Sequence, residues 1–181
     1  MTIFICTHIL KIVVWENIMN KIALELIEKA NRENVACLNL RNLKITTLPP
    51  EIGQLSKIEY LNISDNQISQ LPPEIGLLTN LKILDIFSNQ LTQLPKEIGR
   101  LSNLKYLNIA GNQLTQLPKE IGQLSELECF EIAGNQIIKL PKEIGQLSNL
   151  KTLHISENQI ELSKEIFEFL EKAKVTFERI E

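Results

Sequence analysis

The sequence predicts an α/β solenoid, a right-handed coil of stacked units with a parallel sheet on one side and short helical or 3₁₀ turns on the other. A Leu-Pro pair recurs every 23 residues, and a glycine and an asparagine recur with the same period. The repeated residues are Leu48, Leu71, Leu94, Leu117 and Leu140; Gly53, Gly76, Gly99, Gly122 and Gly145; and Asn66, Asn89, Asn112, Asn135 and Asn158. A period of this length, kept in three registers, is typical of repeat solenoids.

Composition supports a globular chain and excludes several classes of protein. The 181 residues are 44% hydrophobic and 23% charged, which is enough for a buried core and excludes disorder and collagen-like sequence. The formal net charge of −3 disfavours a nucleic-acid partner, because such proteins neutralise phosphates with basic residues. The three cysteines, Cys6, Cys37 and Cys129, are too few for a disulfide scaffold.

The first element is an apolar segment over residues 1–18. It fits a secretory signal poorly, since no basic residue precedes the apolar run and no small-residue cleavage site follows it. It is also too short for an integral membrane segment, which takes about 20 apolar residues. Residues 19–34 are expected to form a capping helix, because Ile22, Leu24, Leu26 and Ile27 have a partly helical apolar spacing. Translation from Met1 and from Met19 both stay open.

Residues 35–162 divide into six units of the repeat. They begin at Val35, Ile58, Leu81, Leu104, Leu127 and Leu150. In each, a short alternating stretch such as Tyr60–Ile63 suits a strand, with Leu61 and Ile63 pointing into the core. The repeated asparagines are expected to bond backbone groups of their own and the neighbouring unit. The proline is expected to open a turn and the glycine to end or relax it.

Residues 163–181 are expected to cap the other end of the stack. Ser163 is the predicted N-cap of a short helix. The residues expected on the apolar face of that helix are Ile166, Phe169, Leu170 and Ala173. A short strand, VTFERI, follows. Helical caps at both ends would cover the apolar ends of the solenoid.

The segment LPKEIGQLSNL, followed by the pattern LxxLxIxxNQL, resembles bacterial leucine-rich-repeat proteins of the 23-residue type, as found in pathogenic spirochaetes. The resemblance covers about residues 35–162. It implies a leucine-rich-repeat horseshoe whose concave sheet binds partners, and a surface-exposed or secreted protein. It implies no catalytic residues. The free cysteines instead favour a reducing compartment, so a cytoplasmic location and the cell surface both stay open.

Differences between units fall mainly at strand positions that point away from the core, on the concave face. The first column there is Cys37, Tyr60, Ile83, Tyr106, Cys129 and Thr152; the second is Asn39, Asn62, Asp85, Asn108, Glu131 and His154; the third is Arg41, Ser64, Phe87, Ala110, Ala133 and Ser156. Tyr60, Ile83, Phe87 and Tyr106 are expected to form an apolar patch about 10 Å wide, bordered by Asn62, Asp85 and Asn108. Alternatively, pairing of the two tyrosines with Ile83 only stabilises the sheet.

Cys129, Glu131 and His154 project from neighbouring strands on the same face. These residue types can build a nucleophilic or zinc site, but an open sheet offers no pocket, no oxyanion donor and no fourth ligand. We therefore expect polar residues at the edge of a protein-binding face, without metal or cofactor. Cys37 and Cys129 lie four units apart, about 19 Å, which is too far for a disulfide.

The sequence thus predicts a non-enzymatic module that binds a protein or peptide partner. A self-associating structural protein is one alternative, with a homo-oligomer formed through the apolar patch or the N-terminal apolar segment. A substrate-recognition subunit, with the catalytic part on another chain, is a further alternative.

Overall fold

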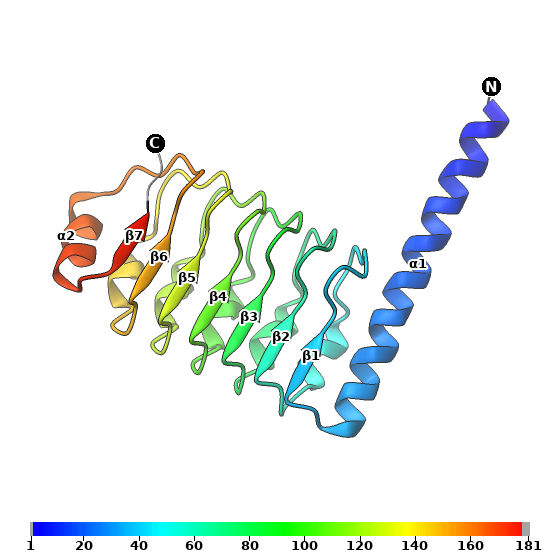
Figure 1. Cartoon of the computed structure of the whole chain (residues 1–181), viewed down its shortest axis with the longest axis horizontal. Coiled ribbons are helices and arrows are strands. Elements are labelled where there is room, and N and C mark those ends of the chain that lie inside the picture. The colour runs from blue at the N-terminus through cyan, green and yellow to red at the C-terminus, as the bar shows by residue number, and fades with distance from the viewer. Residues whose placement is uncertain (1, 179–181) are drawn as a thin grey trace.

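The computed structural model describes the backbone of residues 2–178 and the side chains of residues 14–176. Helices α1 (Thr2–Glu33) and α2 (Lys164–Lys172) lie at the two ends of a stack of repeats (Figure 1). The strands are β1 (Cys37–Asn39), β2 (Tyr60–Asn62), β3 (Ile83–Asp85), β4 (Tyr106–Asn108), β5 (Cys129–Glu131), β6 (Thr152–His154) and β7 (Thr176–Glu178). The 3₁₀ turns are η1 (Pro50–Gln54), η2 (Pro73–Leu77), η3 (Lys96–Arg100), η4 (Lys119–Gln123) and η5 (Lys142–Gln146).

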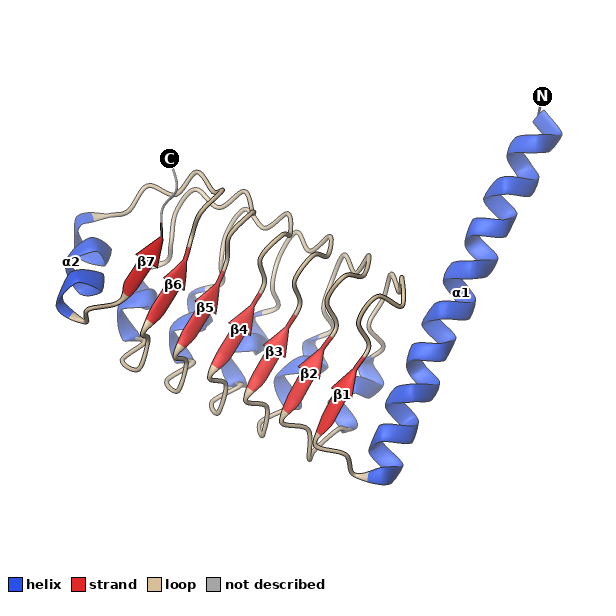
Figure 2. Cartoon of the chain, viewed as in Figure 1, coloured by secondary structure: helices blue, strands red, loops and turns tan. Residues whose placement is uncertain are grey.

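The strands form one open parallel sheet in sequence order, from β1 to β7. Figure 2 shows the strands along one side of the stack and the 3₁₀ turns behind them. Neighbouring strands pair at equivalent repeat positions, so that Leu61 lies beside Leu84 and Leu84 beside Leu107. The predicted α/β solenoid is confirmed, and its columns of equivalent residues are real neighbours.

The core is a continuous stack of leucine and isoleucine side chains between the sheet and the turns. Leu61 and Ile63 are fully buried, as the alternation predicts. Phe130 takes the place of a leucine in β5 and is also fully buried. Because each unit buries its apolar face only against its neighbours, the stack is stable only as a whole.

The repeated asparagines tie the units together, as predicted. Asn112 Nδ2 donates to the carbonyl oxygens of Ile109 in its own unit, at 3.0 Å, and of Ile86 in the preceding unit, at 3.1 Å. Its Oδ1 accepts from the backbone N–H of Leu91, also in the preceding unit, at 3.0 Å. Equivalent bonds are made by Asn66, Asn89, Asn135 and Asn158. We call these five residues the asparagine ladder.

The repeated glycines lie one residue before the end of the 3₁₀ turns, so they do not end them, which was one of the two roles expected. Gly99 lies inside η3, which continues to Arg100. A Cβ atom at Gly99 would lie 2.5 Å from the carbonyl oxygen of Glu120 in the next turn. The glycine is needed because successive turns pack too closely for a side chain. The last of these glycines, Gly145, is different, since its Cβ would meet only Phe169 Cγ at 4.0 Å.

The C-terminal part of helix α1 covers the first unit. Ala23, Ile27 and Ala30 are buried, and Asn20 Oδ1 accepts from the backbone N–H of Thr46 at 3.1 Å. The helix runs without a break through residue 19, where the capping helix was expected to begin, and its N-terminal end points away from the repeats (Figure 1). Across the described residues, no helix is both long enough and apolar enough to cross a membrane.

The C-terminal end follows the prediction closely. The Ser163 side chain caps α2 by accepting from the backbone N–H of Ile166 at 3.4 Å. Ile166 and Leu170 are buried and Phe169 packs against the core, but Ala173, expected on the same face, is exposed because it ends the helix. Strand β7 then pairs with β6 and extends the sheet by one strand.

Candidate functional site

The first column of the concave face places Tyr60, Ile83 and Tyr106 side by side on adjacent strands, each half-buried. Phe87 follows the end of β3 and is 43% exposed. Its ring leans over the next unit, since a Cβ atom at Gly111 would lie 3.3 Å from Phe87 Cε2. Tyr60, Ile83 and Tyr106 are thus the first residues of their strands, whereas Phe87 lies beyond the end of β3. Asp85, the last residue of β3, lies between Ile83 and Phe87 in the chain.

The second column has a structural task that sequence reasoning missed. Asn62 Oδ1 accepts from the backbone N–H of Ser64 at 2.9 Å, and Asp85 Oδ1 accepts from that of Phe87 at 3.1 Å. Asn108 Oδ1 makes the same bond to the backbone N–H two residues ahead, at 3.0 Å. Short Asn and Asp side chains favour this turn, so their position at the strand ends was the available signal.

Asn62 is further engaged within the sheet. It is only 7% exposed, and its Nδ2 lies 3.3 Å from the hydroxyl oxygen of Tyr60 and 3.4 Å from Asp85 Oδ2. Of the residues predicted to border the patch, Asn62 is therefore mostly buried and hydrogen-bonded to Tyr60 and Asp85. Asp85 and Asn108 are half-buried and remain partly open to solvent.

The centre of the concave face disfavours negative charge. Burial raises the pKa of the Asp85 carboxyl, although the Phe87 N–H and Arg41 act to lower it. Burial also raises the pKa of Tyr106 to about 12, with smaller contributions from Glu131, Asp85 and Cys129. Partly desolvated acids with negative neighbours hold their protons more tightly. Burial is thus the main cause of both shifts, and acidic neighbours add to it at Tyr106.

Cys129, Glu131 and His154 come together as the sequence suggested. Glu131 Oε2 lies 2.5 Å from His154 Nδ1, and Glu131 Oε1 lies 3.5 Å from Cys129 Sγ. Burial raises the pKa of the Cys129 thiol, and Glu131 raises it further, which favours the thiol over the nucleophilic thiolate. Within the described part of the chain, no three His, Cys, Asp or Glu residues are arranged to hold a metal ion. The geometry suits hydrogen bonding to a ligand better than covalent chemistry.

Charged residues at the starts of the strands are paired with one another. Lys82 Nζ lies 2.8 Å from Glu59 Oε2, and Glu128 contacts both Lys105 and Lys151. These two acidic residues and their partners flank the first column, and we call them the charged rim. The two carboxylates of the rim thus contact three ammonium groups, and Glu128 is shared by Lys105 and Lys151.

The cysteines with described side chains, Cys37 and Cys129, are free thiols. This agrees with the distance that the repeat predicts between them. The side chain of Cys6 lies outside the described residues.

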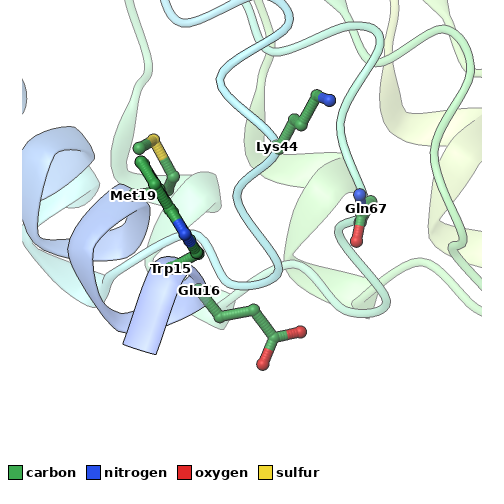
Figure 3. A pocket seen from close by; sticks show the side chains of 5 residues that line it. All are labelled: Trp15, Glu16, Met19, Lys44 and Gln67. Atoms are coloured by element: carbon green, nitrogen blue, oxygen red, sulfur yellow. The ribbon is translucent and has the colours of Figure 1, made fainter. Parts of the chain in front are cut away.

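A separate hollow of about 410 Å³ lies between α1 and the loops of the first two units. Figure 3 shows Trp15, Glu16 and Met19 on the helix and Lys44 and Gln67 on the loops. It is at the end of the stack and does not belong to the concave face. Sequence analysis did not identify this hollow, because it depends on how the helix docks.

Comparison with known proteins agrees with the repeat architecture. A family profile described as a leucine-rich repeat region matches residues 6–104 and 90–172. A leucine-rich-repeat protein of Leptospira interrogans is similar in structure, with a TM-score of 0.74 and 41% identity over 81% of this chain and 37% of the other. No curated protein sequence matches significantly.

Two plant receptors are also similar in structure. The ectodomain of the receptor kinase GASSHO1/SCHENGEN3 from Arabidopsis thaliana has a TM-score of 0.71 and 29% identity, over 83% of this chain and 19% of the other. The plant peptide hormone receptor RGFR1 has a TM-score of 0.70 and 35% identity, over 80% of this chain and 24% of the other. The chain thus spans well under half of each of these three structures. It belongs to the leucine-rich-repeat family, as a bacterial protein with 23-residue units.

Proposed function

We propose that the chain is a non-enzymatic interaction module that binds a protein or peptide partner on its concave face. The observation that carries the proposal is the arrangement of the four residues predicted as an apolar patch: both tyrosines of the chain flank Ile83 on adjacent strands, and Phe87, separated from Ile83 by Asp85, stays 43% exposed. Aromatic side chains are enriched in the cores of protein interfaces. In a chain with only 5% aromatic residues, their concentration on one face favours recognition over sheet pairing alone.

The fold also suits binding without rearrangement. The asparagine ladder and the stacked core fix the strands, so the side chains of the patch are held in place before a partner arrives. A preorganised surface loses little conformational entropy on binding, and more of the contact energy therefore appears as affinity.

The plant structures give independent support. GASSHO1/SCHENGEN3 is described in complex with CASPARIAN STRIP INTEGRITY FACTOR 2, and RGFR1, a peptide hormone receptor, in complex with RGF2. The same repeat architecture therefore serves recognition of other molecules in those proteins. For this chain, we extend the proposal to a partner of either the same cell or a host, in line with the resemblance to spirochaete proteins.

The test is affinity capture with wild type and the triple variant Tyr60→Ser, Phe87→Ser, Tyr106→Ser as baits. Leu77→Ser with Ile138→Ser is the matched control, because those side chains are 53% and 50% exposed outside the concave columns. Thermal melts first establish that all baits are folded. Own-cell lysate and host-cell surface extract are probed separately, so the extract that yields the partner identifies its compartment.

We expect a protein that wild type and the control retain and the triple variant loses. Equal retention by all three baits would contradict concave-face binding, and so would the absence of any retained protein.

A second candidate function, self-association, is favoured by α1. Five of its side chains are 36–61% exposed, and Trp15 among them lines the hollow: Val14, Trp15, Ile18, Ile22 and Leu26. Exposed apolar surface of this kind is a common feature of homo-oligomer interfaces. Sedimentation velocity over a range of concentrations, with wild type and Trp15→Ser, Ile22→Ser, tests it. A monomer at all concentrations would exclude this function.

A further inference from the structure

We propose that the centre of the concave face binds a basic side chain, Lys or Arg, of an extended segment of its partner. The cation would lie over Asn108, between the carboxylates of Asp85 and Glu131 and against the ring of Tyr106. This inference rests on the proposed function, since it names the chemistry of the partner that the same face would take.

The sheet register supplies the two carboxylates at a suitable separation. Asp85 pairs with Asn108, and Asn108 pairs with Glu131, on three adjacent strands. With strands about 4.8 Å apart, the two acidic residues lie about 10 Å from each other. A cation above Asn108 would then lie about 5 Å from the strand on either side. The Asp85 carboxylate contacts Asn62 and the Glu131 carboxylate contacts His154, so each would turn towards the cation, at a range in which opposite charges interact appreciably.

The acidic residues have few cations of their own. Arg41 is the only Lys or Arg in the three concave columns; it pairs with Asp65 at 2.7 Å and also lowers the pKa of Asp85. Each lysine of the charged rim contacts Glu59 or Glu128. Glu131 contacts His154 on β6, and no Lys or Arg of the concave columns lies beside it. The excess negative charge is therefore complementary to a basic ligand group.

The surroundings strengthen such a contact. Asp85, Tyr106 and Cys129 are all partly desolvated, so an opposite charge is screened less there than on an open surface. Tyr106 also offers an aromatic ring two residues before Asn108 on the same face, and aromatic rings attract Lys and Arg. The stem of the basic side chain would lie against the apolar neighbours Ile83 and Phe87.

The probe is a positional-scanning library of decapeptides without cysteine, tested against three folded proteins. These are wild type, the variant Asp85→Asn with Glu131→Gln, and the control Glu59→Gln with Glu128→Gln. Both double variants raise the formal net charge of −3 by two, but the control does so on the charged rim. Asn at position 85 keeps an oxygen that can accept from the Phe87 N–H.

We expect wild type and the control to select peptides with Arg or Lys beside an apolar residue. The Asp85→Asn, Glu131→Gln variant should lose the basic preference and bind the best peptide about tenfold more weakly. Replacing the selected Arg by neutral citrulline should cost wild type the same factor. It should cost the Asp85→Asn, Glu131→Gln variant little, because the interaction is already gone.

The two proposals fail in distinguishable ways. Selection of neutral or acidic peptides that the triple variant Tyr60→Ser, Phe87→Ser, Tyr106→Ser no longer binds would overturn the basic-ligand inference and leave concave-face binding intact. The same holds for a basic preference that survives in Asp85→Asn, Glu131→Gln. If wild type selects no peptide above the triple variant, the proposed function fails, and the basic ligand with it.

Discussion

Removal of one rung of the asparagine ladder should destabilise the chain in a way that depends on its place in the stack. In Asn112→Ala, the buried N–H of Leu91 loses its acceptor, whereas the carbonyls of Ile86 and Ile109 keep the donors Asn89 and Asn135. An orphaned buried N–H costs about 1–3 kcal/mol, and the two lost donor bonds add about 0.5–1.5 kcal/mol each. We expect a loss of about 3 kcal/mol in the free energy of unfolding.

The last rung gives a matched comparison. Asn158 makes the same bonds, accepting from the N–H of Ile137 at 3.0 Å, but it is half-buried at the end of the ladder. Water can replace part of what it supplies, so Asn158→Ala should cost about 1 kcal/mol. The exposed neighbour Gln113→Ala should change stability by no more than about 0.5 kcal/mol.

Urea unfolding followed by far-ultraviolet circular dichroism measures these differences, provided that the dependence on urea is the same for all variants. A loss below about 1 kcal/mol for Asn112→Ala would refute the reasoning, because the ladder would then be a consequence of stacking and not a cause of its stability. An equal loss for Asn112→Ala and Asn158→Ala would show that burial of the rung does not set its contribution.

Three other outcomes follow from the described contacts. Gly99→Ala should cost about 1–3 kcal/mol in urea unfolding, because its Cβ would lie 2.5 Å from the Glu120 carbonyl oxygen, whereas Gly145→Ala should be neutral or slightly stabilising. Tyrosine absorbance should show Tyr106 ionising near pH 12. Between pH 10 and pH 12 the folded chain keeps a proton that the unfolded chain loses, so the free energy of unfolding should fall as the pH rises through this interval. The fall should be smaller in Tyr106→Phe. Ser163→Ala should lower stability by about 0.5–1 kcal/mol, because the capping bond to α2 is long at 3.4 Å, and an unchanged melt would contradict a capping role.

The fold was predictable because the same alternating pattern of apolar residues recurs in every unit. Leu61, Leu84 and Leu107 each carry the same alternating pattern, so their pairing in the sheet follows from the period alone. The capping bond of Ser163 was likewise local, since it joins residues three apart in the chain. Where one unit's own sequence contains the physical cause, sequence reasoning succeeded.

Predictions were wrong or incomplete where the cause lies in another part of the chain. The role of Gly99 depends on Glu120, one unit later, and a glycine near the end of a turn suggests termination when considered alone. Helix α1 passes through residue 19 because residues 2–33 contain no proline or glycine. The boundary was expected there because Met19 is a possible translation start and opens an amphipathic segment. The side of α1 that is buried depends on how the helix docks against the first unit. The buried residues there are Ala23, Ile27 and Ala30.

The candidate site divides in the same way. The first column followed from alternation, and the structure gives Tyr60, Ile83 and Tyr106 the predicted neighbours. The polar border of the patch did not follow from alternation. Alternation places a side chain on the outward face but does not show whether it is open to solvent or hydrogen-bonded within the sheet. Asn62 is the clearest case, since it points outward by position and is nevertheless 7% exposed.

The second column also bears on the proposed recognition at the middle of the concave face. The short side chains of Asn62, Asp85 and Asn108 each accept a hydrogen bond, through one oxygen, from the backbone N–H two residues ahead. This bond fixes the direction of the side chain. Glu131 and His154 have longer side chains and contact each other instead, across the strands. The second oxygen of Asp85 lies 3.4 Å from Asn62 Nδ2, and the two oxygens of Glu131 lie near Cys129 and His154. A basic ligand between the two acids would thus meet Asp85, which a backbone bond fixes, and Glu131, which only side chains hold. Replacing Asp85 should therefore weaken selection among ligands more than replacing Glu131.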